Sequence, residues 1–82
     1  MKKIFLAFDY EGKKITGTGK NDFENFTGEV FIKVSSIVAI SRDVWNNKKT
    51  NIHSTSDTVF NVSHSIDEVI EYITEFYKEN EK

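Results

Sequence analysis

Apolar and polar side chains alternate along the chain in short runs, a pattern that predicts β-strands over most of its length. The first run, residues 3–10, is apolar at both odd and even positions, which is typical of a central strand covered on both faces. Glu11-Gly12 offers a turn, and residues 13–18 can return as a weaker second strand. These segments predict an N-terminal hairpin within residues 1–20.

An irregular stretch follows this hairpin. Glycine and polar residues at positions 17–22 interrupt the alternation, as they do in loops. Phe23 and Phe26 come directly after it, and we expect their rings to pin the loop onto the core. Core strands are then predicted within residues 28–63, namely residues 30–35, 37–40, 50–54 and 58–62.

Two polar segments separate the last three of these strands. Residues 43–49 contain Asn46-Asn47, and asparagine tolerates the left-handed backbone of tight turns. Ser56-Asp57 is the next turn. Both segments predict hairpin connections between neighbouring strands.

One helix is predicted at residues 65–79. Ser65 and Glu68 match the S-x-x-E capping box, in which each side chain accepts a hydrogen bond from an otherwise unpaired backbone amide. Beyond the cap, apolar residues recur every three or four positions and acidic residues occupy the opposite face. We expect this apolar stripe to lie on the sheet; it comprises Ile66, Val69, Ile70, Ile73, Phe76 and Tyr77.

The composition supports a chain with much β-structure, because 9 Ile, 7 Val and 7 Phe stand against one Leu, one Met and two Ala. We predict an α+β fold, a small antiparallel sheet or open barrel of five to six strands with one C-terminal amphipathic helix. A chain of 82 residues has room for a single domain, residues 1–82, with a small core. Small cores often gain support from association, so a homo-oligomer is expected.

Several protein classes are excluded by residues that the sequence lacks. It has no cysteine, which rules out disulfide frameworks, thiolate zinc sites, iron–sulfur clusters and cysteine nucleophiles. A net charge of −2 indicates neither nucleic acid nor a membrane surface as partner. The apolar runs are shorter than a signal-peptide core or a membrane span, so we expect a cytoplasmic protein.

No catalytic or cofactor motif is recognisable. The two histidines, His53 and His64, fall on different predicted elements without a spaced carboxylate partner, so we expect no enzyme, no metal site and no cofactor. The segment Gly17-Thr18-Gly19-Lys20 lacks the spacing of a Walker phosphate loop and is interpreted as a turn.

The most informative candidate site is the polar turn at residues 43–49 together with the residue before it. Tryptophan and arginine dominate binding hot spots, and this segment has both. The candidate binding residues are Arg42, Trp45, Asn47, Lys48 and Lys49. Three roles for Trp45 stay open: a lid folded back over the sheet edge, an anchor for a protein partner, or a platform on which a nucleotide base stacks.

Charge is unevenly distributed along the chain. Residues 1–50 have a net charge of +3, and residues 51–82 have a net charge of −5. A basic strand end can therefore meet an acidic partner, or the acidic helix of another copy of the same chain.

The order of these elements resembles that of small FlbD-like proteins, and short uncharacterised phage proteins have a similar pattern. The resemblance covers about the last 55 residues, to which this chain adds an N-terminal hairpin. It lies in Gly28-Glu29-Val30-Phe31-Ile32, Ser36-Ile37-Val38-Ala39-Ile40, the strand Asp57 to Val62, and Ser65-Ile66-Asp67-Glu68-Val69-Ile70. The family is associated with flagellar motility and brings no catalytic residues, so the resemblance implies the fold and a role without catalysis.

Together these observations predict a small non-enzymatic binding protein, encoded by a phage or a bacterium, that modulates or inhibits a host protein by direct binding. A protein is the expected partner. One alternative is an oligomer that sequesters a small nucleotide-like signal molecule at its subunit boundaries, and another is an FlbD-like motility factor. Nucleic acids and membranes are not expected partners.

Overall fold

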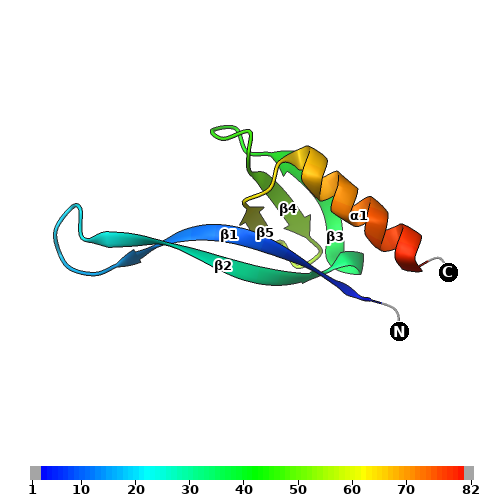
Figure 1. Ribbon diagram of the computed structural model, residues 1–82, viewed down its shortest axis with the longest axis horizontal. Helices are drawn as coiled ribbons and strands as arrows, with labels where there is room; N and C mark the ends of the chain where they lie inside the picture. The colour runs from blue at the N-terminus through cyan, green and yellow to red at the C-terminus, as the bar shows by residue number, and fades with distance from the viewer. Residues whose placement is uncertain (1–2, 81–82) are drawn as a thin grey trace.

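The computed structural model describes residues 3–80. Its strands form two antiparallel sheets, with strand orders β1-β2 and β3-β4-β5, and one helix follows at the C-terminus (Figure 1). The α+β class is confirmed, whereas a single sheet or open barrel is not formed by the described residues. The elements are β1 (Phe5–Ile15), β2 (Phe23–Lys33), the 3-10 turn η1 (Val34–Ser36), β3 (Ile37–Arg42), β4 (Thr50–Ser54), β5 (Val59–Val62) and α1 (Ile66–Asn80).

β1 and β2 form one long hairpin. Their register pairs Ile15 with Phe23 next to the connecting residues 16–22. The turn predicted at Glu11-Gly12 is wrong, because β1 continues through it. The N-terminal hairpin predicted within residues 1–20 is wrong for the same reason.

Two pairs of a glycine and an aromatic residue explain why the strand continues. Gly12 lies opposite Phe26 and Gly28 lies opposite Tyr10, all on one face of the hairpin. A Cβ atom at Gly12 would lie 2.4 Å from Cζ of Phe26, and one at Gly28 would lie 2.6 Å from Cζ of Tyr10. The two rings meet edge to face, with centroids 6.2 Å apart. Each glycine thus leaves room for a ring from the opposite strand, and this packing favours a strand over a turn.

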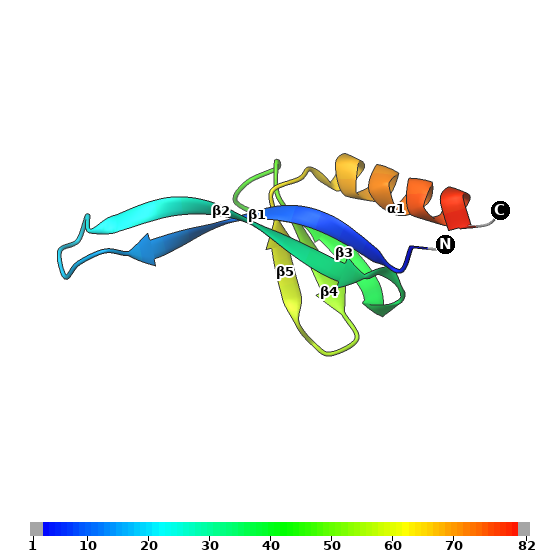
Figure 2. The same ribbon diagram turned by 60° about the horizontal axis from the view of Figure 1, so that its bottom comes forward.

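The outer part of this hairpin, residues 11–27, is named the arm below. It projects away from the other elements, at the end of the molecule opposite to the two termini (Figures 1 and 2). Phe23 and Phe26 lie on the arm and are exposed, so the prediction that they pin a loop onto the core is wrong. They pack within the hairpin instead, Phe26 over Gly12 and Phe23 under the ammonium of Lys13.

β1 is not a central strand covered on both faces. Phe8 points into the core, whereas Phe5 and Ala7 on the opposite face are exposed. Phe31, which lies opposite Ala7 on β2, is exposed as well. The hairpin therefore covers the core as an outer layer with one buried face.

The two turns of the second sheet are built differently. The turn between β4 and β5 lies at Ser56-Asp57 as predicted, and Asp57 takes a left-handed backbone with a φ angle of 63°. Among residues 3–80, Asp57 is the only non-glycine residue with positive φ. Asn46-Asn47 therefore do not supply the left-handed backbone expected of them. The loop between β3 and β4 is shaped by other interactions, which are described in the next subsection.

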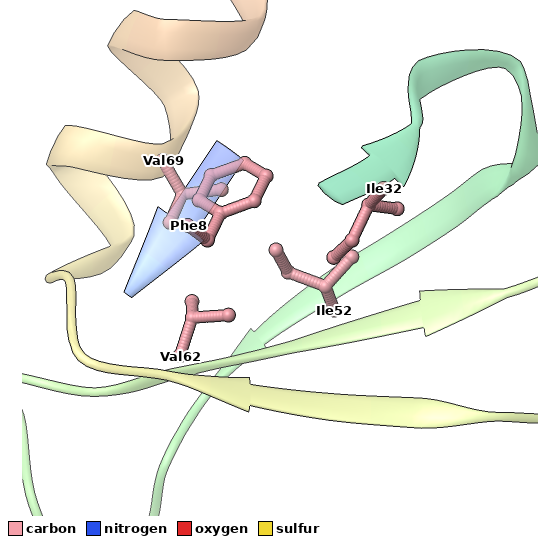
Figure 3. Packing of buried hydrophobic residues seen from close by; sticks show 5 residues of the cluster. All are labelled: Phe8, Ile32, Ile52, Val62 and Val69. Carbon is pink, nitrogen blue, oxygen red and sulfur yellow. The ribbon is translucent and has the colours of Figure 1, made fainter. Parts of the chain in front are cut away.

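The core joins five elements through five side chains (Figure 3). Each is at most 3% exposed, and other partly buried residues pack around them. Because the two sheets and the helix each contribute, none of the three layers buries its apolar face alone. The five residues are Phe8 of β1, Ile32 of β2, Ile52 of β4, Val62 of β5 and Val69 of α1.

α1 begins with the predicted capping box. The N–H of Glu68 donates to Oγ of Ser65, and the N–H of Ser65 donates to Oε1 of Glu68, both over 3.3 Å. Phe76 of the predicted stripe is buried, whereas Ile70 and Tyr77 at its margin are exposed. Over residues 3–80, the chain has no helix with the length and apolar character needed to cross a membrane.

We predict that two phenylalanines on neighbouring strands differ sharply in their effect on stability. Phe8 is 1% exposed, so Phe8→Ala leaves a cavity and should lower the free energy of unfolding by about 3–5 kcal/mol. Phe31 is 62% exposed, so Phe31→Ala should change it by less than about 0.5 kcal/mol. Urea unfolding followed by circular dichroism measures both, and equal losses would contradict the buried face assigned to the hairpin.

Candidate functional site

The loop between β3 and β4, residues 43–49, presents two adjacent apolar side chains to solvent and is named the Trp45 loop. Trp45 is 93% exposed and Val44 is 85% exposed. Trp45 therefore does not fold back over the sheet edge, which removes the lid from the three roles considered for it. Apolar side chains with this exposure contribute little to the core, and neighbouring ones are typical of an interaction site.

Asp43 holds the Trp45 loop in shape. Its Oδ1 accepts hydrogen bonds from the backbone N–H of Trp45 at 2.8 Å and of Asn46 at 3.1 Å. Its Oδ2 accepts a third from Nδ2 of Asn61 on β5 at 2.9 Å. An aspartate that binds the amides two and three residues further along builds a turn without left-handed backbone. This explains why Asn46 can remain at negative φ.

Further hydrogen bonds close the loop. The N–H of Asp43 donates to the carbonyl of Lys49 at 3.2 Å, and the N–H of Lys49 donates to the carbonyl of Asn46 at 3.0 Å. Oδ1 of Asn46 accepts from the N–H of Lys48 at 2.9 Å. A loop ordered in this way loses little conformational entropy when it binds a partner.

The same hydrogen bonds act on the charge of Asp43. The N–H of Trp45 has the largest effect and, with the amide of Asn61, lowers the pKa of the Asp43 carboxyl below its ordinary value of 3.8. Because the pKa is lower in the folded state, this stabilisation is fully present above the ordinary value. It is lost as the pH falls through the lowered pKa. The loop therefore keeps its shape at neutral pH.

The other candidate residues occupy different positions around the loop. Arg42 is exposed at the end of β3, and Asn47 and Lys48 are exposed in the loop itself. Lys49 is half-buried, and its Nζ lies 3.6 Å from Oε2 of Glu11 on the arm. Lys49 thus links the loop to the arm, while Arg42 and Lys48 supply exposed positive charge in the segment that carries Trp45.

A second constellation, around His64 between β5 and α1, was missed by sequence reasoning. Nε2 of His64 accepts a hydrogen bond from the N–H of Asp9 at 3.0 Å, and Nδ1 lies 3.5 Å from Oε2 of Glu68. Its ring meets Phe8 and Tyr72 edge to face, with centroids 5.9 and 5.3 Å away. His64 therefore joins β1 to α1. The only local signal was a histidine before a helix cap, and Asp9 is 55 positions away.

A groove of about 320 Å³ lies beside His64, between β1 and α1. Part of its lining is apolar, from Leu6, Ala7, Tyr72 and Phe76. Its charged lining residues are four carboxylates and one lysine, so we name it the acidic groove. Phosphate-bearing ligands are repelled by such a lining. The charged residues are Lys3, Asp9, Glu29, Glu75 and Glu79.

His53 has a hydroxyl partner on the neighbouring strand. Its Nε2 lies 3.0 Å from Oγ of Ser41, where both side chains reach solvent. Nucleophilic catalysis also needs a group that orients the histidine and donors that stabilise developing negative charge. The ion pairs found among residues 3–80 include no carboxylate next to His53. The pair joins β3 to β4.

We predict that Asp43→Ala releases the Trp45 loop without unfolding the protein. The amides of Trp45 and Asn46 lose a charged acceptor, so their hydrogen exchange should accelerate by at least about tenfold. Exchange measured by NMR tests this, with Asp67→Ala, which removes an exposed aspartate outside the loop, as the control. Unchanged exchange in Asp43→Ala would show that the loop does not depend on this carboxylate.

No protein-family model, no curated protein and no solved structure matches the chain. The resemblance to FlbD-like proteins therefore remains a prediction from the sequence.

Proposed function

We propose that this chain is a non-enzymatic binding protein that recognises another protein through the Trp45 loop. The observation that carries the proposal is the 93% exposure of Trp45 on a loop held by the hydrogen bonds of Asp43. Flexible chain ends can expose a tryptophan by chance, but this loop is closed at both ends and tied to β5. The chain thus orders a large apolar side chain where it adds nothing to folding.

The chemistry of the loop suggests the kind of surface it fits. Tryptophan loses little side-chain entropy on binding and is enriched among the hot spots of protein interfaces. Val44 extends the apolar contact, and Arg42 and Lys48 add positive charge in the same segment. A matching partner surface has an apolar pocket with an acidic rim. The modulation or inhibition of a host protein, and a phage or bacterial origin, are the parts of this proposal that come from the sequence alone.

The alternative of sequestering a nucleotide-like signal finds less support. Phosphate groups require amide or cationic donors, whereas the acidic groove has four carboxylates and one lysine. Its aromatic residues, Tyr72 and Phe76, lie next to Glu75 and Glu79. The Trp45 loop, with exposed indole and exposed cations, is the better candidate for any ligand contact, and its convex exposure suits a protein pocket more than a small molecule.

Trp45→Ala should weaken partner binding by about 30-fold or more, since hot-spot residues contribute at least about 2 kcal/mol. The tagged protein first captures a stoichiometric partner from a lysate of its bacterial host. Calorimetry with the purified partner then compares wild type with Trp45→Ala. Phe31→Ala removes another exposed aromatic side chain, from the face of β2, and should leave affinity unchanged.

Fluorescence supplies an independent readout, because Trp45 is the only tryptophan. Its emission should be that of a hydrated indole in the free protein and should shift to shorter wavelength when the partner is added. Equal affinities of wild type and Trp45→Ala, or an emission unchanged at saturation, would contradict the proposal.

A further inference from the structure

The arm is tied to the Trp45 loop by the ion pair of Glu11 with Lys49, and its outer part extends away from the other elements. The radius of gyration is 14.9 Å, against about 12 Å for a compact protein of 82 residues, and the longest dimension is 53 Å. Figures 1 and 2 show the arm extending beyond all other elements. Two-stranded hairpins are marginal on their own in water. The arm is thus a segment whose order is most easily explained by a surface that it contacts in an assembly.

One face of the arm tip combines apolar and basic side chains, although the arm as a whole has three lysines and three carboxylates. Ile15 is 79% exposed and lies opposite Phe23, which is also exposed. Lys13 lies on the same face as Ile15, with its ammonium over the Phe23 ring, and Lys20 lies in the connecting loop; neither takes part in an ion pair found among residues 3–80. Lys14 lies opposite Glu24, and Asp22 in the connecting loop accepts a hydrogen bond from the N–H of Gly19. The face with Lys13, Ile15 and Phe23 is thus suited to a surface that is apolar and acidic.

The acidic groove has this complementary chemistry. Glu29 of β2 takes part in none of the described ion pairs, and Glu75 of α1 contacts only Lys78 at 3.8 Å. Leu6, Ala7 and Tyr72 add apolar surface in the same groove. The chain's own arm projects away from α1, which lines the groove, as Figure 1 shows, so an arm lying in the groove would belong to a second copy.

We propose that two copies of the chain exchange arms, each arm tip lying in the acidic groove of the other copy. A two-fold axis makes the two contacts identical, so the assembly closes as a dimer. Ile15 and Phe23 of one copy then cover the apolar part of the groove, and Lys13 and Lys20 approach Glu29 and Glu75 of the other. The Trp45 loop takes no part in the contact, so this inference is independent of the proposed function.

Substitutions that reverse the charge of the arm or of the groove test the dimer. The arm variant is Lys13→Glu/Lys20→Glu and the groove variant is Glu29→Lys/Glu75→Lys; all four positions are exposed. Native mass spectrometry of the full chain should give twice the 9.5 kDa chain mass for wild type and a monomer for each variant alone. An equimolar mixture of the two variants should give the heterodimer, because each arm then meets a groove of opposite charge at both contacts.

A matched charge change elsewhere on the chain serves as the control. Lys33→Glu/Lys48→Glu lowers the net charge as much as the arm variant does, at two positions outside the arm and outside the groove lining, and its dimer should persist. Thermal unfolding is measured for each variant. A cooperative transition with a midpoint temperature near that of wild type shows that the monomeric variants are folded. A wild-type monomer at the highest soluble concentration, a dimer that survives in both variants, or two variants that stay monomeric when mixed would each overturn the proposal. Trp45→Ala should remain dimeric even where it no longer binds its partner.

Discussion

The contact of Phe8 with the residues around it is the constraint on which the rest of the structure depends. Phe8 forms one buried cluster with Ile32, Ile52, Val62 and Val69, which joins the hairpin, the second sheet and the helix. The two sheets share no strand, and without this apolar contact little would set their relative positions. Burial of these side chains supplies the main free energy that orders all three layers.

Hydrogen bonds next to the cluster fix how β1 lies relative to the second sheet. The N–H of Ser63 donates to the carbonyl of Asp9 at 2.7 Å, and the buried Thr50 donates its hydroxyl to the carbonyl of His64 at 2.7 Å. A third hydrogen bond runs from the N–H of Asp9 to Nε2 of His64. Together these bonds hold β1 against the end of β5. Because β1 is held there, its outer half must leave the body as the arm, and the ion pair of Lys49 with Glu11 ties the Trp45 loop to that exit.

The parts of this molecule that followed from the sequence are local. The capping box predicted the start of the helix, because its two hydrogen bonds join residues three positions apart. The Ser56-Asp57 turn was predicted because polar residues separate two apolar runs there, and its left-handed backbone at Asp57 was found only in the structure. The Trp45 loop was identified by residue type alone, since an isolated tryptophan in a polar turn has no place in the alternation. Its internal order depends on Asp43 and Asn61, which are 18 positions apart, and no local pattern indicated that pair.

By itself, the sequence determined the strands between residues 37 and 62, where the helix begins and which turn contains Trp45 and basic residues, because these properties depend on neighbours a few residues away. Tertiary structure decided that β1 runs through Glu11-Gly12, since the ring of Phe26, 14 positions from Gly12, fills the space that the glycine leaves. It also decided that the strands divide into two sheets and that His64 meets Asp9. Such pairings are selected by packing and hydrogen bonding between distant segments, and alternation along one strand is compatible with many of them.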